Sequence, residues 1–284
     1  MNALRSVKEV REALAPARRS GKTIGLVPTM GALHAGHEKL IQTARKGADL
    51  VAVSIFVNPL QFGPSEDYAK YPRALPKDLE LCGRTGADFV FAPPVEEMYP
   101  LPQLTFAEVT RVSEKLCGAF RPGHFRGVAT VVLKLFNIIQ PDRTWFGEKD
   151  MQQLAVIRRM VTDLNLPIEV IGVSTVREPD GLALSSRNQY LSAEERKAAP
   201  VLYRALQEAA TVIRSGERST RKVREAGMAI LNKETLICVE YLEVVDPDEM
   251  QPVSDVSGRV RVAAAIRIGN TRLIDNVPGK LATD

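Results

Sequence analysis

The feature that most constrains this chain is a regular alternation of short apolar runs and amphipathic stretches that extends to about residue 176. Short apolar runs bounded by turn residues are typical of strands buried on both faces, and longer amphipathic stretches predict helices. The runs predict strands at 23–27, 50–57, 88–91, 143–146 and 168–173. The stretches predict helices at 3–15, 37–47, 76–85, 124–139 and 150–164. This alternation favours an α/β fold, a Rossmann-like parallel sheet with helices on both faces.

The pattern changes beyond this region. Two further helices are predicted at 193–214 and 219–232, and three strands of a smaller antiparallel sheet at 236–245, 259–268 and 271–275. We therefore expect two domains, a Rossmann-like domain at 1–176 and a smaller α+β domain at 177–284. The proline-rich stretch 93–102 is expected to be a loop.

Composition limits the class of protein. Hydrophobic residues make up 45% of the chain and charged residues 25%, which is typical of a globular protein that buries a large core. No apolar run approaches the roughly 20 residues of a membrane span, and residues 1–20 lack the apolar core of a signal peptide, so we expect a cytoplasmic protein. The net charge is +4, and acidic residues are interspersed with short basic clusters. This pattern argues against a nucleic-acid or membrane partner.

Residues 28–37, Pro-Thr-Met-Gly-Ala-Leu-His-Ala-Gly-His, connect the first predicted strand to the helix at 37–47. A glycine-containing turn in this position binds phosphate, because the N–H groups and the dipole of the helix N-terminus face the anion. Two of the three histidines in the chain, His34 and His37, lie in this turn. Their imidazoles can stabilise charge on a phosphoryl group. A shared metal ion and a structural, helix-capping role remain open as alternatives.

Two more polar segments follow predicted strands. Asn58 and Gln61 come directly after 50–57, where amides can orient small substrate groups, although Asn-Pro also favours an ordinary turn. In Phe-Gly-Glu-Lys-Asp at 146–150, Gly147 permits close approach of the backbone and Lys149 can bind phosphate. A capped helix start explains that segment equally well.

Three other features carry weaker signals. Leu-Ala-Leu-Ser-Ser-Arg-Asn at 182–188 combines hydroxyl groups with Arg187, which suits a triphosphate, but it also suits a surface loop. Arg-Pro-Gly-His-Phe-Arg-Gly at 121–127 concentrates cations and glycines before an apolar helix, and either contacts substrate or forms a structured turn. Asp78, on a predicted helix, is a candidate ligand for Mg²⁺ on a phosphate, although a solvated acid is the simpler interpretation.

As a set and in this order, these segments resemble the pantothenate synthetase (pantoate–β-alanine ligase) family, whose His-x-Gly-His sequence is a form of the HIGH motif of the nucleotidylyltransferase superfamily. The matching segments are Val-Pro-Thr-Met-Gly-Ala-Leu-His at 27–34, Gly-His at 36–37, Ser-Ile-Phe-Val-Asn-Pro at 54–59, Gln-Phe at 61–62, Tyr-Pro-Arg at 71–73, and the segments 121–127, 146–150 and 184–188. The chain has neither a P-loop motif nor a G-x-G-x-x-G fingerprint, so kinases and dinucleotide-binding enzymes are disfavoured.

The resemblance implies a two-step ligation. The carboxylate of (R)-pantoate attacks the α-phosphorus of ATP, accompanied by Mg²⁺, to give pantoyl adenylate and pyrophosphate. The amine of β-alanine then attacks the acyl carbon and releases AMP, which yields pantothenate, vitamin B5, for coenzyme A biosynthesis. The family further implies a homodimer and a role for 177–284 as a lid over the nucleotide- and pantoate-binding domain.

The resemblance also implies roles for individual residues. ATP-binding residues would be Met30, Gly31, Ala32, Leu33, His34, Ala35, Gly36, His37, Gly147, Glu148, Lys149, Asp150, Val176, Leu184, Ser185, Ser186 and Arg187. Catalytic residues would be His34, His37, Lys149 and Arg187. Pantoate would contact Gln61 and Gln153, and β-alanine would contact Gln61 and Asn58. The Mg²⁺ role of Asp78 is proposed from its own position and not from the resemblance. The alternative within the superfamily is another HIGH-motif nucleotidylyltransferase, and outside it a basic nucleic-acid-binding protein.

Overall fold

The structure is a computed structural model that describes residues 1–64 and 66–282. The chain divides into two compact units, which are described separately. Unit 1 comprises Met1–Val109, Arg121–Glu148 and Val156–Ser174, and unit 2 comprises Thr110–Phe120, Lys149–Ala155 and Thr175–Asp284. Among the described residues, no helix has the length and hydropathy needed to cross a membrane.

Unit 1 is built on a six-stranded sheet in which every pairing is parallel. Its strands, in spatial order, are β1 (Ala3–Leu4), β4 (Phe89–Phe91), β3 (Leu50–Ile55), β2 (Ile24–Thr29), β5 (Arg143–Gly147) and β6 (Glu169–Val173). From β2 the chain winds toward β3 and β4, and it then crosses back to β5 and β6. The winding direction therefore changes between β2 and β5, which is where ligands bind in open parallel sheets.

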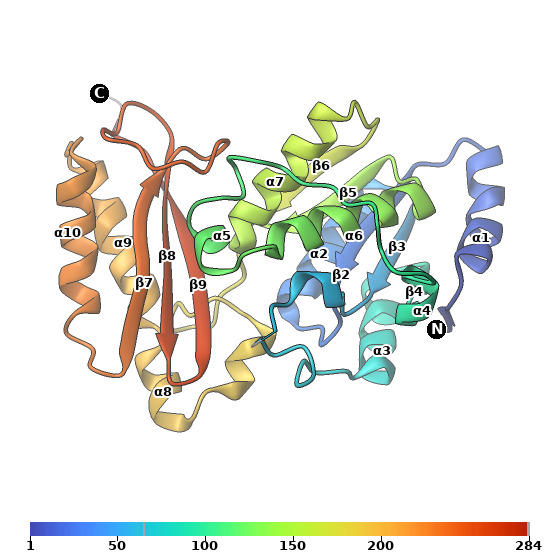
Figure 1. Cartoon of the computed structure of the whole chain (residues 1–284), viewed down its shortest axis with the longest axis horizontal. Helices are drawn as coiled ribbons and strands as arrows, with labels where there is room; N and C mark the ends of the chain where they lie inside the picture. The colour runs from blue at the N-terminus through green and yellow to red at the C-terminus, as the bar shows by residue number, and fades with distance from the viewer. Residues whose placement is uncertain (65, 283–284) are drawn as a thin grey trace. The chain divides into compact units, whose positions relative to one another are not determined.

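Helices lie on both faces of this sheet (Figure 1). This follows from the reversal in winding, because connections between parallel strands are almost always right-handed. The helices α2 (Ala35–Gly47) and α3 (Leu75–Thr85) contact each other and the strands on one face. The helix α6 (His124–Ile139) covers the other, with α1 (Val7–Arg19) packed against it. The short helix α4 (Val95–Met98) and the 3₁₀ turn η1 (Pro59–Gln61) follow strands β4 and β3.

The only tryptophan in the chain fixes the position of α2 on the sheet. Trp145 of β5 is 1% exposed. A β-carbon on Gly25 would lie 2.7 Å from its ring, and one on Gly47 would lie 2.8 Å from it. Glycines in β2 and at the end of α2 therefore leave the space that the indole fills. The contact with Trp145 fixes the C-terminal end of α2 on the sheet, and with it the position of the whole helix.

Unit 2 contains a three-stranded antiparallel sheet of β7 (Ile237–Val245), β8 (Val260–Ile268) and β9 (Thr271–Gly279). The helices α9 (Val201–Arg214) and α10 (Thr220–Leu231) pack on one of its faces (Figure 1). Its other elements are α5 (Cys117–Phe120), α8 (Ala193–Ala198), and the 3₁₀ turns η2 (Glu148–Asp150) and η3 (Ser186–Tyr190). The helix α7 (Met151–Asp163) begins in unit 2 and ends in unit 1, and η2 likewise spans the boundary between them.

The structure confirms the predicted α/β class, the parallel sheet and the small antiparallel sheet. Three local predictions are wrong. The first helix begins at Val7, because a Ser6 capping box starts it there and residues 3–4 pair with β4. The predicted helix at 193–214 is interrupted at Pro200, which has no N–H to donate. The expected loop at 93–102 contains α4. The lid role of 177–284 and the 176/177 domain division stay predictions.

Candidate active site

The turn between β2 and α2 has a strained backbone, which a glycine and nearby hydrogen bonds stabilise. Gly31 and Ala32 have φ values of +83° and +51°, in the left-handed region. A β-carbon on Gly31 would lie 3.0 Å from the Asp78 carboxylate and 3.1 Å from Ile55, so glycine relieves both constraints. Thr29 Oγ1 accepts the Gly31 N–H at 3.2 Å and donates to the Ser54 carbonyl at 2.7 Å.

Asp78 of α3 stabilises the same turn by hydrogen bonds to its backbone. Its side chain is buried, and its two oxygens accept the N–H groups of Ala32 at 3.0 Å and Leu33 at 2.8 Å. Burial raises the pKa of Asp78, and these two hydrogen bonds act in the opposite direction. The geometry favours a turn-holding role, because both oxygens already bind backbone. The role of Asp78 as a Mg²⁺ ligand stays a prediction.

Both histidines of the turn cap the helix that they begin. His34 is the N-cap of α2, and its Nδ1 accepts the Gly36 N–H at 3.1 Å. His37 Nδ1 accepts the His34 N–H at 3.2 Å, and the two ring centroids are 4.2 Å apart. A backbone N–H only donates, so both Nδ1 atoms are unprotonated and each neutral ring carries its proton on Nε2.

This tautomer separates the alternatives that the sequence left open. An Nε2–H group is a hydrogen-bond donor, whereas a metal ligand must present an unprotonated nitrogen. With Nδ1 already occupied by backbone, the pair is suited to an anion at the N-terminus of α2 rather than to a metal ion. The capping interpretation is also correct, because the contacts that cap the helix are those that determine the tautomer.

Asn58 and Gln61 lie after β3 and are almost completely buried. Asn58 Nδ2 donates to Gln61 Oε1 at 3.2 Å and to the Gly127 carbonyl at 3.1 Å. Its Oδ1 accepts the Leu60 N–H and the hydroxyl of Tyr99, the latter at 2.8 Å. Gln61 Nε2 in turn lies 3.0 Å from the sulfur of Met30. The Asn58 amide is therefore occupied within the protein and orients Gln61.

Sequence reasoning missed Tyr99 and Thr29. Burial raises the pKa of Tyr99, so its phenol keeps the proton that it donates to Asn58. No local motif marks Tyr99, and Thr29 lies within the segment 28–37 without being singled out there, because the roles of both depend on contacts with segments distant in sequence. Thr29 pairs with Ile55 in the parallel register of β2 and β3, so a correct sheet order would have placed its hydroxyl next to the Ser54 carbonyl.

The predicted ATP segment at 147–150 lies at the end of β5, and the boundary between the compact units falls between Glu148 and Lys149. A β-carbon on Gly147 would meet nothing within 4 Å, so the backbone there is open. In unit 2, Lys149 Nζ is 3.5 Å from Asp150 Oδ1, and its carbonyl accepts a hydrogen bond from Asn276 of β9 at 3.0 Å.

The two adjacent glutamines of α7 have different environments. Gln152 is buried, accepts the Cys117 N–H at 3.0 Å, and donates to the carbonyls of Val112 and Lys115. Gln153 is only partly buried. The Gln152 amide is therefore occupied by hydrogen bonds to the loop before α5. Gln153 is the better candidate for binding a substrate.

The segment from Val176 to Arg187 in unit 2 is held by an ion pair. Arg177 donates to both carboxylate oxygens of Asp275, at 2.5 and 2.9 Å, and to the Gly181 carbonyl at 3.0 Å. The Val176 carbonyl accepts the Leu184 N–H at 3.0 Å. Ser185 caps η3 by accepting the Arg187 N–H at 3.3 Å. The predicted phosphate-binding loop is thus anchored a few residues upstream of its serines.

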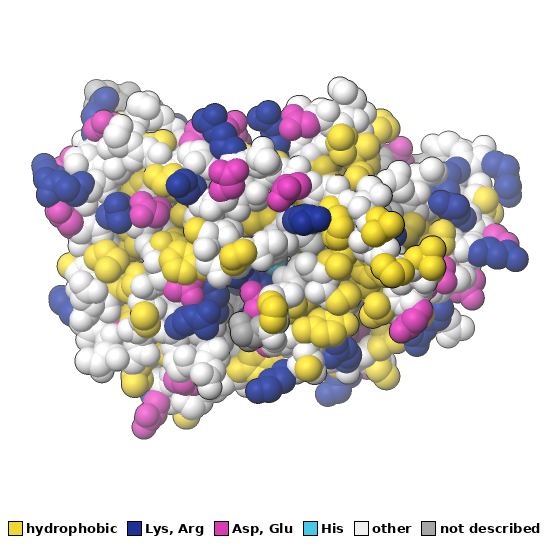
Figure 2. Space-filling model, in the orientation of Figure 1, with side chains coloured by type: hydrophobic (Ala, Val, Ile, Leu, Met, Phe, Trp, Pro, Cys, Tyr) yellow, Lys and Arg dark blue, Asp and Glu magenta, His cyan; other side chains and the backbone are white. Residues whose placement is uncertain are grey.

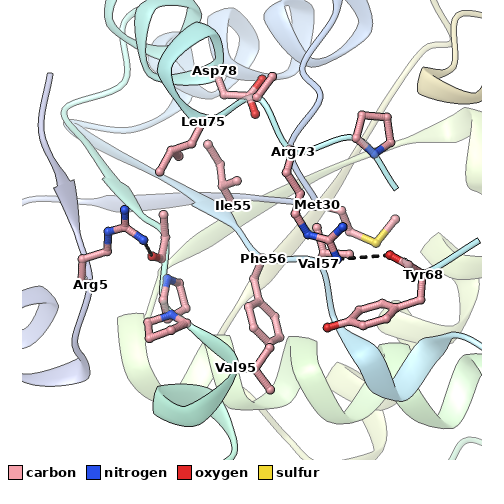
Figure 3. A pocket seen from close by; sticks show the side chains of 16 residues that line it. Arg5, Met30, Ile55, Phe56, Val57, Tyr68, Arg73, Leu75, Asp78 and Val95 are labelled. Atoms are coloured by element: carbon pink, nitrogen blue, oxygen red, sulfur yellow. Dashed lines mark hydrogen bonds between the residues drawn. The ribbon is translucent and has the colours of Figure 1, made fainter. Parts of the chain in front are cut away.

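A cavity of about 240 Å³ in unit 1 borders the histidine turn at Met30 and Gly31. Figure 3 shows Asp78 and Leu75 on one side of it and Tyr68 with Arg73 on another. Arg73 donates to the carbonyls of Tyr68 and Tyr71. Its guanidinium also lies 5.3 Å from the centre of the Tyr68 ring, so Arg73 stabilises the segment that lines this side of the cavity.

Two groups of predicted site residues emerge. Unit 1 brings together the turn 30–37, Asn58, Gln61, Asp78 and the end of β5 at the carboxyl edge of the sheet. Unit 2 contains Lys149, Asp150, Gln153, Val176 and 184–187.

Comparison with known proteins places this geometry in a family. The family model described as pantoate-beta-alanine ligase matches residues 2–278. A pantothenate synthetase of Moorella thermoacetica is 54% identical over 277 residues, which cover 98% of each chain. A pantothenate synthetase of Thermoanaerobacter sp. is 53% identical over 271 residues, covering 95% of this chain and 96% of that one.

Solved structures agree. Pantothenate synthetase from Thermus thermophilus is similar with a TM-score of 0.93 at 49% identity, covering 98% of this chain and 99% of that one. Pantoate-beta-alanine ligase from Francisella tularensis, complexed with beta-gamma ATP and beta-alanine, is similar with a TM-score of 0.79 at 33% identity, covering 98% and 97%. The chain therefore belongs to the pantoate–β-alanine ligase family.

Proposed function

We propose that this protein condenses (R)-pantoate with β-alanine in an ATP-dependent reaction that forms pantothenate through a pantoyl adenylate. The observation that carries the chemistry is the pair of Nε2–H histidines at the N-terminus of α2. Membership of the family and identities near 50% over nearly the whole chain support the substrates. Another HIGH-motif nucleotidylyltransferase is not favoured, since the matched relatives are pantothenate synthetases.

In the first step a pantoate carboxylate oxygen attacks the α-phosphorus, and the bond from that phosphorus to the bridging oxygen of pyrophosphate breaks. Negative charge on the phosphoryl oxygens increases during this step. The N–H groups of His34 and His37 would stabilise such charge together with the dipole of α2, a role that their position at the N-terminus of this helix supports. Lys149 and Arg187 supply cations for the phosphates of ATP, and backbone groups of 30–37, 147–150, Val176 and 184–186 hold the nucleotide.

In the second step the neutral amine of β-alanine attacks the acyl carbon, AMP leaves, and the nitrogen loses a proton. Gln61 contacts pantoate and β-alanine, and Gln153 contacts pantoate. Asn58 serves β-alanine by fixing the Gln61 amide, a role that the Asn58–Gln61 hydrogen bond supports. Residues 177–284 act as a lid that excludes water, because a mixed anhydride is prone to hydrolysis.

Mg²⁺ enters as part of the MgATP substrate, with the phosphates and water as its main ligands. The described residues contain no cluster of three or more side chains suited to a metal ion, so no step is assigned to a metal held by the protein. We expect the enzyme to act in the cytoplasm, where ATP is available. On the face shown in Figure 2, acidic and basic side chains are interspersed, which favours small-molecule partners over nucleic acid.

The homodimer that the family implies would use an apolar segment of unit 1. Residues 100–109 lack regular secondary structure and expose Leu101 (76%), Leu104 (90%) and Phe106 (37%). Exposed apolar side chains of this kind mark interaction surfaces. A Leu104→Asp variant should shift the sedimenting species from dimer to monomer in analytical ultracentrifugation, and an unchanged monomer for both proteins would reject this assignment.

The test of the function is an AMP-release assay with MgATP and pantoate, with and without β-alanine. We expect steady AMP release only when β-alanine is present, and pantothenate in equal amount. AMP release that does not depend on β-alanine would overturn the ligase assignment. Isotope exchange between pyrophosphate and ATP in the absence of β-alanine tests the adenylation step separately.

A further inference from the structure

We propose that Arg121, His124 and Gly127 form a cradle that positions Gln61 through its backbone, without contacting either substrate. The proposal rests on the function proposed above only in assigning Gln61 to pantoate and β-alanine. His124 and Gly127 lie three residues apart at the start of α6, on the same side of the helix, and Arg121 lies on the turn just before it. Each of them contacts the segment from Asn58 to Gln61.

Gly127 allows the closest of these contacts. A β-carbon at this position would lie 2.2 Å from the Leu60 carbonyl oxygen and 2.6 Å from the Gln61 backbone nitrogen. These are backbone atoms, which cannot rotate away as a side chain can. Only glycine lets η1 lie directly on α6, and the Gly127 carbonyl accepts the Asn58 amide at the same place.

His124 holds the other end of η1. Its Nδ1 is 2.8 Å from the Gln61 carbonyl oxygen, and its Nε2 is 3.0 Å from Nη1 of Arg121. A carbonyl only accepts and a guanidinium only donates, so the neutral ring carries its proton on Nδ1 and accepts at Nε2. His124 is therefore the opposite tautomer to His34 and His37.

Glu66 locks Arg121 in the orientation that this tautomer needs. Arg121 Nε donates to Glu66 Oε1 at 2.7 Å, and Nη2 donates to Glu66 Oε2 at 2.5 Å. Burial alone would raise the pKa of Glu66, but the hydrogen bonds and the charge of Arg121 act in the opposite direction, and the pKa is lowered. Nη2 also donates to the Gln61 carbonyl at 3.3 Å, so arginine and histidine grip the same oxygen.

The contacts together form one chain, from Glu66 through Arg121 and His124 to the Gln61 carbonyl. The Gln61 side chain is held separately, by Asn58 and Met30. The backbone of Gln61 is thus fixed by the cradle and its amide by Asn58, which together determine where the amide lies. Residues 121–127 form a structured element with this positioning role.

The first test is independent of activity. The chain has three histidines, so their ring ¹⁵N signals can be assigned by loss in single variants. In the wild-type protein at neutral pH we expect one Nδ1–H ring, lost in His124→Asn, and two Nε2–H rings. An Nε2–H tautomer for His124 would overturn the proposal even if the enzyme is a fully active ligase.

The second test uses three variants of His124. The amide nitrogen of Asn occupies the place of Nδ1, whereas that of Gln occupies the place of Nε2. We expect His124→Ala and His124→Gln to raise KM for pantoate about tenfold, as the loss of one hydrogen bond would, with kcat and KM for ATP changed less than about twofold. His124→Asn should restore KM for pantoate to within about threefold of the wild-type value.

Arg126→Ala is the matched control, because Arg126 belongs to the same segment but stacks on the Phe106 ring, 3.8 Å from its centre. It should leave KM for pantoate unchanged. Equal effects of Asn, Gln and Ala at position 124, or a fall in kcat without a change in KM for pantoate, would overturn the positioning role. A wild-type enzyme without β-alanine-dependent AMP release would instead reject the proposed function, while the tautomer result stands.

Discussion

The two compact units hold their parts of the proposed site by different physical means, and two buried aspartates show the contrast. Asp78 in unit 1 is 3% exposed and accepts backbone N–H groups of the histidine turn. Asp275 in unit 2 is 4% exposed and accepts two hydrogen bonds from the guanidinium of Arg177. In unit 1 a carboxylate holds a strained backbone, whereas in unit 2 it neutralises a cation that anchors a loop.

This difference matches the chemistry proposed for each part. The turn in unit 1 must present N–H donors in a fixed geometry to a charge that appears only during reaction, which requires preorganisation. In the proposed function, Lys149 and Arg187 of unit 2 meet phosphates that are charged from the start, so their task would be binding. Substitutions of the histidines of the turn should therefore affect the reaction rate, whereas substitutions at Arg177 should affect folding of the loop.

The largest effect is expected from Arg177→Met. Removing the guanidinium leaves Asp275 as a buried charge without its partner, which costs about 3–5 kcal/mol of the free energy of unfolding. Urea unfolding followed by far-UV circular dichroism measures this loss. The double variant Arg177→Met/Asp275→Asn should recover much of it, and a double variant as unstable as the single one would contradict the buried-charge explanation.

His37→Asn is expected to have the next largest effect. Asn Oδ1 can take the place of Nδ1 as the acceptor of the His34 N–H, so the cap remains while the Nε2–H donor is lost. Removal of one such donor lowers rates by about 10²–10³-fold. Isotope exchange between pyrophosphate and ATP should fall by that factor with little change in melting temperature. Near-native exchange would reject His37 as a charge stabiliser.

Much of this architecture was predictable from the sequence. The apolar runs predicted every strand of the parallel sheet except β1, whose two residues are too short a run to recognise. The helix at 193–214 was mispredicted because its apolar residues continue on both sides of Pro200, whereas the proline, which lacks an N–H, separates α8 from α9. Helix and strand type followed from periodicity, whereas ends depended on caps and prolines.

The site was predicted as a set of segments, and its internal contacts were not. The motif positions of His34 and His37 indicated phosphate chemistry, but the tautomers depend on individual N–H contacts that no spacing specifies. Asp78 was singled out for a metal, a role that stays a prediction, and the spacing gave no sign that its carboxylate also accepts the N–H groups of Ala32 and Leu33. The roles of Tyr99 and Gly127 depend on contacts with loop 58–61 across 41 and 69 residues of sequence.

Asp78→Ala tests whether the carboxylate in unit 1 stabilises the backbone of the histidine turn. It leaves the N–H groups of Ala32 and Leu33 without acceptors in a strained turn, which should cost about 2–3 kcal/mol of the free energy of unfolding. Trp145 lies in unit 1, so its fluorescence during urea unfolding reports on that unit. KM for ATP should rise as well. An unchanged fluorescence transition would show that the turn holds its shape without Asp78.

The smallest effect is expected from Glu66→Gln, and its pH dependence makes it measurable. The folded-state pKa of Glu66 is lowered, so the pair with Arg121 stabilises the protein above the unfolded-state pKa of about 4.5. That stabilisation is lost as pH falls through the lowered folded-state pKa. The free energy of unfolding of the wild type should exceed that of the variant by about 1 kcal/mol at pH 7, and this difference should vanish in strongly acidic solution. If this difference grows on acidification, Glu66 is not ionised in the folded protein. Its charge could then not be what keeps Arg121 oriented toward His124.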